Sequence, residues 1–351
     1  MAIELSTLTF TEQDDVVPQS GEEGILNTGI ANTLAGNDII LGTEQISIDT
    51  PNQQVFTSLF NSGTLNTADG DDIITGIISH IESTGNYWGI YNRGSIYTGD
   101  GNDKIMGSGF WGIANLSNIT TNNGNDIISG TSDGDGGPGI SSQGNINTGD
   151  GDDIITGTNT SGGGYGIFNG FGTPDEIANT TLDTGDGNDI IMGIGTYGIA
   201  NLGNINTGDG ADYIISDTSS NNGTEYGSGN SGTINTGDGD DLITEISGHS
   251  ILNLGIINTG NGADSIIVEG GFYEYPYGSG PIPGSVFLEN GKDYLKGFGG
   301  GDFNGGNGKD TLELTSGSYT VGISETTVNF IKGSTIMKTS DFEILIVGNT
   351  T

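Results

Sequence analysis

The sequence GISSQGNINTGDGDDIITG, residues 139–157, contains both halves of a unit that recurs along most of the chain. The first half follows Gly-Ile-x-Asn-x-Gly-x-Ile, with Ser for Asn in this copy, and the second follows Asn-Thr-Gly-Asp-Gly-x-Asp-x-Ile-x-Gly. Residues 198–216 repeat both halves as GIANLGNINTGDGADYIIS. Alignment on Gly-x-Asp gives eleven units; a spacing of 23 residues occurs three times, and several longer spacings contain Gly-, Ser- and Asn-rich insertions. Such a repeat predicts stacked turns of a solenoid.

The spacing of the aliphatic residues indicates strands. Counted from the Gly-x-Asp aspartate as position 0, Ile or Leu stands at −7 in eight units and at +2 in all eleven. Positions −13, −9 and −7 share one parity, which places them on one face of a strand, and Thr at −5 falls on the same face. Glycine, at 67 of 351 residues, opposes helix. Such short strands bury their aliphatics only by stacking, so we predict an all-β, parallel β-solenoid.

A column of asparagines near position −11 leaves two interpretations open. Asn92, Asn115, Asn201 and Asn253 stand there. Stacked units would let them form an internal hydrogen-bonded ladder, whereas isolated units would use them as ordinary turn residues.

Composition excludes several classes of protein. Asp and Glu number 45 against 7 Lys and Arg, which gives a net charge of −38 and predicts that neither nucleic acid nor anionic membrane is a partner. No Cys is present, so disulfides and thiolate metal sites are excluded, and the chain has only two His. No apolar run is long enough for a membrane-spanning helix.

The acidic residues recur with the repeat and predict a bound cation. Aspartate occupies position 0 in every unit and position −3 in six of them. Stacked carboxylates would repel by about 0.9 kcal/mol per pair at ~4.8 Å in water. Protons would relieve this at low pH, and at neutral pH a hard divalent cation would do so; oxygen ligands suit Ca²⁺. The predicted ligands are Asp38, Asp69, Asp72, Asp100, Asp103, Asp126, Asp150, Asp153, Asp186, Asp189, Asp209, Asp212, Asp238, Asp241, Asp264, Asp293 and Asp310.

A family resemblance appears in the same residues. Residues 305–313, GGNGKDTLE, match Gly-Gly-x-Gly-x-Asp-x-aliphatic-x, and the internal units match it with Thr for the first Gly. The chain thus resembles RTX (hemolysin-type calcium-binding repeat) proteins of the cyanobacterial type. The resemblance implies a right-handed parallel β-roll, calcium in the turns, folding on external calcium, and type I export through an uncleaved C-terminal signal.

The chain departs from the tandem nonapeptides of that family. Each unit has one acidic turn, so we expect one calcium column rather than two. Asn123 and Asn261 replace Asp at −3 in two units, where we expect weaker sites, and Ala35 stands there in the first unit.

We predict three regions. Residues 1–23 form an N-terminal edge strand, ELSTLTF, and a cap, without a usual cleaved secretion signal. Residues 24–296 form the solenoid. Residues 297–351 contain the nonapeptide and a β cap that is either a plain cap or also the export signal. The predicted location is extracellular or at the cell surface.

Catalytic motifs receive no support. No His-Glu-x-x-His is present, and the Gly-x-Ser-x-Gly string around Ser132 lacks the strand-to-helix setting of a nucleophile elbow. His80 and His249 share an equivalent loop position. We therefore predict that the chain is not an enzyme; a polysaccharide-active enzyme is the least favoured alternative.

Two binding alternatives remain beside a calcium-dependent structural protein that associates into a surface layer, sheath or filament. An ice-binding face would use the outward columns at −8 and −6, but their residues are too mixed to predict one. A stripe of aromatic residues before the first half-unit either covers a corner of the core or contacts a glycan, such as a cell-surface polysaccharide, or another subunit. The stripe consists of Tyr87, Trp88, Phe110, Trp111, Tyr165, Tyr197 and Tyr226.

Overall fold

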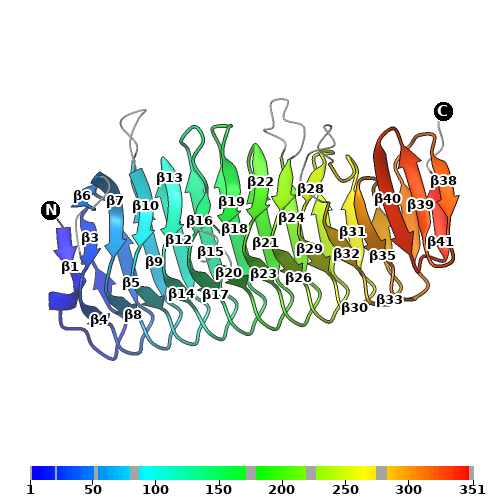
Figure 1. The fold of residues 1–351 in the computed structure, drawn as a ribbon. Helices are drawn as coiled ribbons and strands as arrows, with labels where there is room; N and C mark the ends of the chain where they lie inside the picture. The colour runs from blue at the N-terminus through cyan, green and yellow to red at the C-terminus, as the bar shows by residue number, and fades with distance from the viewer. Residues whose placement is uncertain are drawn as a thin grey trace.

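The computed structural model is an elongated coil of short strands that advances from the N-terminal to the C-terminal end (Figure 1). It describes residues 2–19, 22–50, 54–79, 87–170, 179–218, 227–273 and 283–347. Within them the only helical turn is a 3₁₀ turn, Leu5–Thr7, and no helix has the length and apolar character to cross a membrane.

Most turns of the coil contribute one strand to each of three long sheets, and the first sheet ends at β28 (Ile251–Asn253) while the other two continue. The first sheet contains β1 (Ala2–Glu4), β3 (Gly24–Asn27), β7 (Gln54–Asn61), β10 (Tyr87–Asn92), β13 (Trp111–Asn115), β16 (Ile140–Ser142), β19 (Tyr165–Asn169), β22 (Tyr197–Asn201), β25 (Ser228–Asn230) and β28 (Ile251–Asn253), with β6 (Ile46–Asp49) antiparallel to β7. The second contains β4 (Ile30–Asn32), β8 (Thr64–Asn66), β11 (Ser95–Tyr97), β14 (Asn118–Thr120), β17 (Asn145–Asn147), β20 (Thr181–Asp183), β23 (Asn204–Asn206), β26 (Thr233–Asn235), β29 (Ile256–Asn258), β32 (Ser285–Phe287), β35 (Gly301–Asn304), β40 (Thr335–Ser340), β39 (Val328–Lys332) and β38 (Thr320–Ile323).

The third sheet contains β2 (Val16–Val17), β5 (Ile39–Gly42), β9 (Ile73–Ile77), β12 (Lys104–Gly109), β15 (Ile127–Ser132), β18 (Ile154–Asn159), β21 (Ile190–Ile194), β24 (Tyr213–Asp217), β27 (Leu242–Glu245), β31 (Ser265–Val268), β34 (Tyr294–Lys296), β37 (Thr311–Leu314) and β41 (Ile344–Val347). A small fourth sheet joins β30 (Asn261–Gly262), β33 (Asn290–Gly291) and β36 (Asn307–Gly308).

Parallel pairing brings equivalent positions of successive units together. Ile96, at −7, pairs with Leu65 and with Ile119. Ile105, at +2, pairs with Ile74 and with Ile128 in the same way. These aliphatics are fully buried and form columns of one continuous core, which confirms the all-β parallel solenoid.

The asparagine column is an internal ladder. The Asn92 amide accepts from Asn61 and donates to the Asn115 side chain, both at 2.8 Å. Each of these asparagines is buried, so the ladder satisfies polar groups that have no access to water. The interpretation of isolated turn residues is therefore wrong.

Both ends of the coil differ from the expected pattern. In the stretch ELSTLTF only Glu4 belongs to a strand, because its carboxylate accepts from the Ser6 amide and caps a 3₁₀ turn that buries Leu5 over the core. At the other end, stacking continues past residue 297 through β37. The antiparallel strands β38–β40 then follow, with Phe330 and Met337 buried in the core.

Candidate cation site

The acidic half-units form a row of turns between the second and third sheets, the edge of Figure 1 on which β30 and β33 lie. In ten of the eleven units positions −4 and −2 both have positive φ; Gly99 has φ 96° and Gly101 has φ 155°, for example. A Cβ on Gly101 would lie 1.9 Å from the carbonyl oxygen of Gly70 in the preceding turn. Glycine at −2 is thus required both by the backbone conformation and by the closeness of the turns.

The aspartates at position 0 point into the coil. All eleven are 0–2% exposed. The Oδ1 atom of each from Asp72 onward accepts the backbone N–H of the position-0 aspartate in the preceding turn, at 2.7–3.0 Å. Asp15 donates to Asp38 at one end, and Asp310 donates to Glu343 at the other. One carboxylate oxygen per turn is therefore part of the scaffold.

The second oxygen of these carboxylates is buried and, in ten of the eleven, has no hydrogen-bond partner. The ten are Asp38, Asp72, Asp126, Asp153, Asp189, Asp212, Asp241, Asp264, Asp293 and Asp310. In the remaining turn the Thr98 hydroxyl donates to Asp103 Oδ2. Elsewhere the threonine at −5 donates along the coil, as Thr121 does to the Thr148 carbonyl at 3.1 Å. An ionised carboxylate so placed requires a proton or a cation.

Burial raises the pKa of this column, whereas the backbone N–H donors and the nearby threonine hydroxyls, which donate along the coil, act to lower it. The pKa rises to about 7 for Asp103, Asp153, Asp189 and Asp264. It rises to about 6 for Asp72, Asp212, Asp241 and Asp293, and burial also raises the pKa of Asp38, Asp126 and Asp310. Without a cation, part of the column would be protonated near neutral pH.

The aspartates at −3 form a second column on the outside. Asp69, Asp100, Asp186, Asp209 and Asp238 each accept a hydrogen bond from the residue at −3 in the next turn. The carboxylates of Asp150 and Asp186 stand in the same exposed row. The seventeen predicted ligands therefore occupy two columns, and within the described residues no three acidic or histidine side chains converge on one point.

Asparagine at −3 extends this outer column by hydrogen bonding. Asn123 Nδ2 donates to Asp100 at 3.1 Å and Asn261 Nδ2 donates to Asp238 at 2.5 Å. An amide donor separates neighbouring charges, so these turns need less neutralisation than turns with consecutive aspartates.

Sequence reasoning missed a third column, at −1. The Asn102 side chain donates to Asp71 at 3.1 Å and the Asn188 side chain to Asp152 at 2.9 Å. Hydrogen bonds from the backbone and side chain of these asparagines lower the pKa of both carboxyls, which stay ionised. The signal was the Asp-Asp pair at the end of several turns, as at 71–72 and 152–153.

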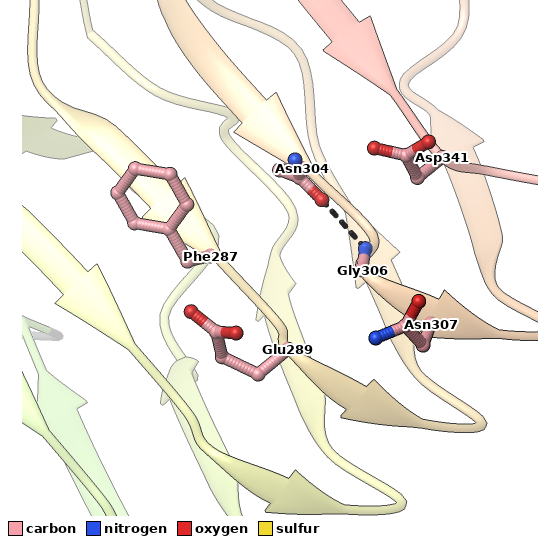
Figure 2. Close-up of a pocket in the computed structure, with 6 residues that line it drawn as sticks. All are labelled: Phe287, Glu289, Asn304, Gly306, Asn307 and Asp341. Carbon is pink, nitrogen blue, oxygen red and sulfur yellow. Dashed lines mark hydrogen bonds between the residues drawn. The ribbon is translucent and has the colours of Figure 1, made fainter.

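A polar cavity of about 290 Å³ lies at the last complete turn (Figure 2). Its lining comprises Phe287, Glu289, Asn304, Gly306, Asn307 and Asp341. Asn304 Oδ1 accepts the Gly306 N–H at 2.6 Å, and Asn307 donates to Asn290 at 2.7 Å. Asp310, the aspartate of the matching nonapeptide, is buried and is not part of the lining, so this cavity is separate from the inner column.

The inner column fits a calcium ion by its donor chemistry. A cation there would take Oδ2 of position 0 and backbone carbonyl oxygens of the turns, which are hard ligands of the kind that Ca²⁺ prefers. Bound calcium would supply positive charge to the Oδ2 atoms, which have no hydrogen-bond partner.

The other candidate residues have structural contacts. Ser132 is buried and donates to the Phe110 carbonyl at 2.7 Å, so it is not presented as a nucleophile. His249 Nδ1 lies 2.9 Å from the Thr218 hydroxyl, which also donates to the buried Glu245. His80 and Tyr226 lie outside the described residues.

Comparison with known proteins identifies no family. No family model and no curated protein matches the chain. A solved structure with a similar fold is a hyperactive, Ca²⁺-dependent, β-helical antifreeze protein from an Antarctic bacterium. The two share 19% identity over 87% of this chain and 78% of the other, with a TM-score of 0.43. A likeness at this level assigns neither a family nor a function.

Proposed function

We propose that the chain is a calcium-dependent, non-enzymatic scaffold protein of the extracellular space, whose fold is completed by Ca²⁺ bound along its acidic turns. The observation that carries the proposal is the row of ten buried Oδ2 atoms without a partner. Protonation of one carboxylate removes the buried charge of one turn only. A cation bound between two turns would neutralise the carboxylates of both.

The donor set favours Ca²⁺ over Mg²⁺. The partnerless oxygens are inaccessible to solvent, so a bound ion must give up most of its water. Ca²⁺ does this readily and tolerates irregular coordination, whereas Mg²⁺ retains water and demands an octahedron. Binding would be coupled to folding, because the site exists only where turns are stacked.

Chelation tests the proposal. We expect excess chelator at pH 7.5 to weaken the β circular-dichroism signal and to lower the thermal unfolding temperature. Both should return with Ca²⁺ at about 1 mM, where extracellular sites bind, and Mg²⁺ at equal concentration is the control. An unchanged spectrum and unfolding temperature in chelator would contradict calcium-dependent folding.

We further propose that the rods associate end to end. In β41, Leu345 pairs with the core residue Leu312, and Val347 pairs with Leu314. Leu345 and Val347 are 49% and 47% exposed, whereas their partners are 1% exposed. Apolar side chains in core register at an exposed end favour contact with another molecule.

A second candidate function is ice binding by the second sheet. In β14, β17, β20, β23 and β26 every outward residue at −8 and −6 is Asn, Thr or Asp. Side-chain bonds fix part of this face: Asn147 and Asn206 both donate to Asp183. Thermal hysteresis of the calcium-loaded protein would support this function, and its absence would remove it.

A further inference from the structure

The outer face of the first sheet carries a second apolar cluster, outside the coil. Phe60, Trp88, Tyr91 and Ala114 belong to it. The antiparallel pair β6–β7 covers the part of this cluster nearest the N-terminal end of the coil, where Val55 is fully buried. Beyond this pair the aromatic row continues over β10, β13 and β19, where it lines an open groove of about 490 Å³.

The groove results from the order of side-chain sizes along one outward column. Tyr91, Ala114, Ser141 and Phe168 occupy equivalent positions in β10, β13, β16 and β19. Two small residues thus stand between two aromatic residues. With strands about 4.8 Å apart, the aromatic residues are separated by roughly 14 Å along the coil.

The two aromatic sides are held in place by ring contacts. Tyr165 stacks on Phe168 and on Tyr197, with centroids 4.9 Å apart in both pairs. On the opposite side the Trp88 and Trp111 rings lie 4.5 Å apart at 55°. Little ordering is therefore required of these rings when a ligand binds.

Two polar side chains of the groove are available for hydrogen bonds to a ligand. Ser141 and Gln143 line it, and in the described part of the chain their side chains make no hydrogen bond. Gly136 also lines the groove, and exposed Asp133 and Asp135 belong to the same loop. The lining of the groove therefore offers aromatic faces, an amide and a hydroxyl.

We propose that this groove binds a neutral saccharide. A pyranose ring presents flat C–H faces to aromatic rings and hydroxyl groups to amide and hydroxyl partners. The charge of the protein, −38, opposes anionic glycans and anionic lipid. The volume of the groove lies within the range of small-molecule sites. It is far larger than a single ammonium group requires, and an ammonium group is the other ligand that aromatic rings bind. The proposal requires the folded coil, but it does not depend on which cation the acidic turns bind.

Both tryptophans of the chain, Trp88 and Trp111, line the groove, so tryptophan emission reports on it directly. The test is titration with cellohexaose, maltohexaose and chitohexaose in calcium-containing buffer, with oligogalacturonate as the anionic comparison. We expect a saturable emission change with at least one neutral oligosaccharide and none with oligogalacturonate.

Matched substitutions locate the binding. Ser141→Phe fills the groove floor and should weaken binding by more than about tenfold. Ala200→Phe places the same ring in the same column, next to Phe168 but outside the groove, and should not change affinity. Gln143→Ala removes one hydrogen-bonding group without altering packing and should weaken binding about fivefold.

Circular dichroism confirms that each variant is folded before its affinity is compared. Absence of a saturable response to every neutral oligosaccharide in folded protein would overturn the proposal. Equal binding by wild type and Ser141→Phe would also overturn it. A loss of self-association in Ser141→Phe without any sugar response would show that the groove is a contact between copies.

Discussion

At the residue scale, the acidic side chains of one turn differ in whether they are buried or exposed. An aspartate at position 0 is a scaffold residue through Oδ1 and an unsatisfied buried group through Oδ2. An aspartate at −3 in the same turn is exposed. The two columns therefore differ in what a cation would contribute to stability.

Asp153→Asn and Asp150→Asn compare these columns within one turn. The Asp153→Asn variant keeps an acceptor for the Asp126 N–H but removes the buried charge. In chelator we expect it to stabilise the fold by roughly 1–2 kcal/mol. In calcium we expect part of the calcium-dependent stabilisation to be lost. Asp150→Asn should change stability by less than about 0.5 kcal/mol in chelator. Urea unfolding measures the stability of both variants. A larger effect of Asp150→Asn than of Asp153→Asn would place the ion at the outer column.

The inner column also predicts a pH dependence for the metal-free protein. Burial raises the folded-state pKa of Asp153 to about 7, above the ordinary value of 3.8. The folded state thus binds more protons than the unfolded state in this range. The stability contribution is complete below pH 3.8 and is lost as pH rises through about 7. In chelator, urea midpoints should be higher at pH 5 than at pH 8. Calcium should raise the midpoint mainly at pH 8, and a metal-free midpoint that rises with pH would contradict this.

At the element scale, strand periodicity and turn conformation carry different amounts of information. The +2 and −7 columns could be predicted because alternation in a strand fixes which side chains point inward. The different exposure of positions −3 and 0 could not be predicted, because positive-φ residues at −4 and −2 interrupt that alternation in nearly every turn. The groove was also hidden, since Ala114 and Ser141 become neighbours only through pairing of strands 27 residues apart.

Gly101→Ala tests the turn. The new Cβ would meet the Gly70 carbonyl at 1.9 Å in a conformation with φ 155°, and we expect a loss of about 2–4 kcal/mol. Gly162→Ala is the control, because Gly162 also has positive φ, 83°, but nothing lies within 4 Å; it should cost about 1 kcal/mol. Thermal unfolding in calcium distinguishes them. Equal losses would show that the closeness of the turns is unimportant.

At the scale of the whole molecule, charge and the exposed end oppose each other. A net charge of −38 keeps rods apart, whereas Leu345 and Val347 expose core-register surface at one end. Bound calcium and salt both reduce the repulsion, so they should favour association of the apolar ends.

Leu345→Lys tests this balance. In calcium, sedimentation of the wild-type protein should show mass rising with concentration and with ionic strength, because screening weakens repulsion while apolar contact persists. Leu345→Lys should remain monomeric, since it places charge at the end of the core column. Ile323→Lys is the control, because Ile323 is 80% exposed on β38, in an antiparallel strand outside that column, and this variant should associate as wild type does. A wild-type mass that stays monomeric at every concentration, or equal loss of association in both variants, would exclude contact through the core-register end.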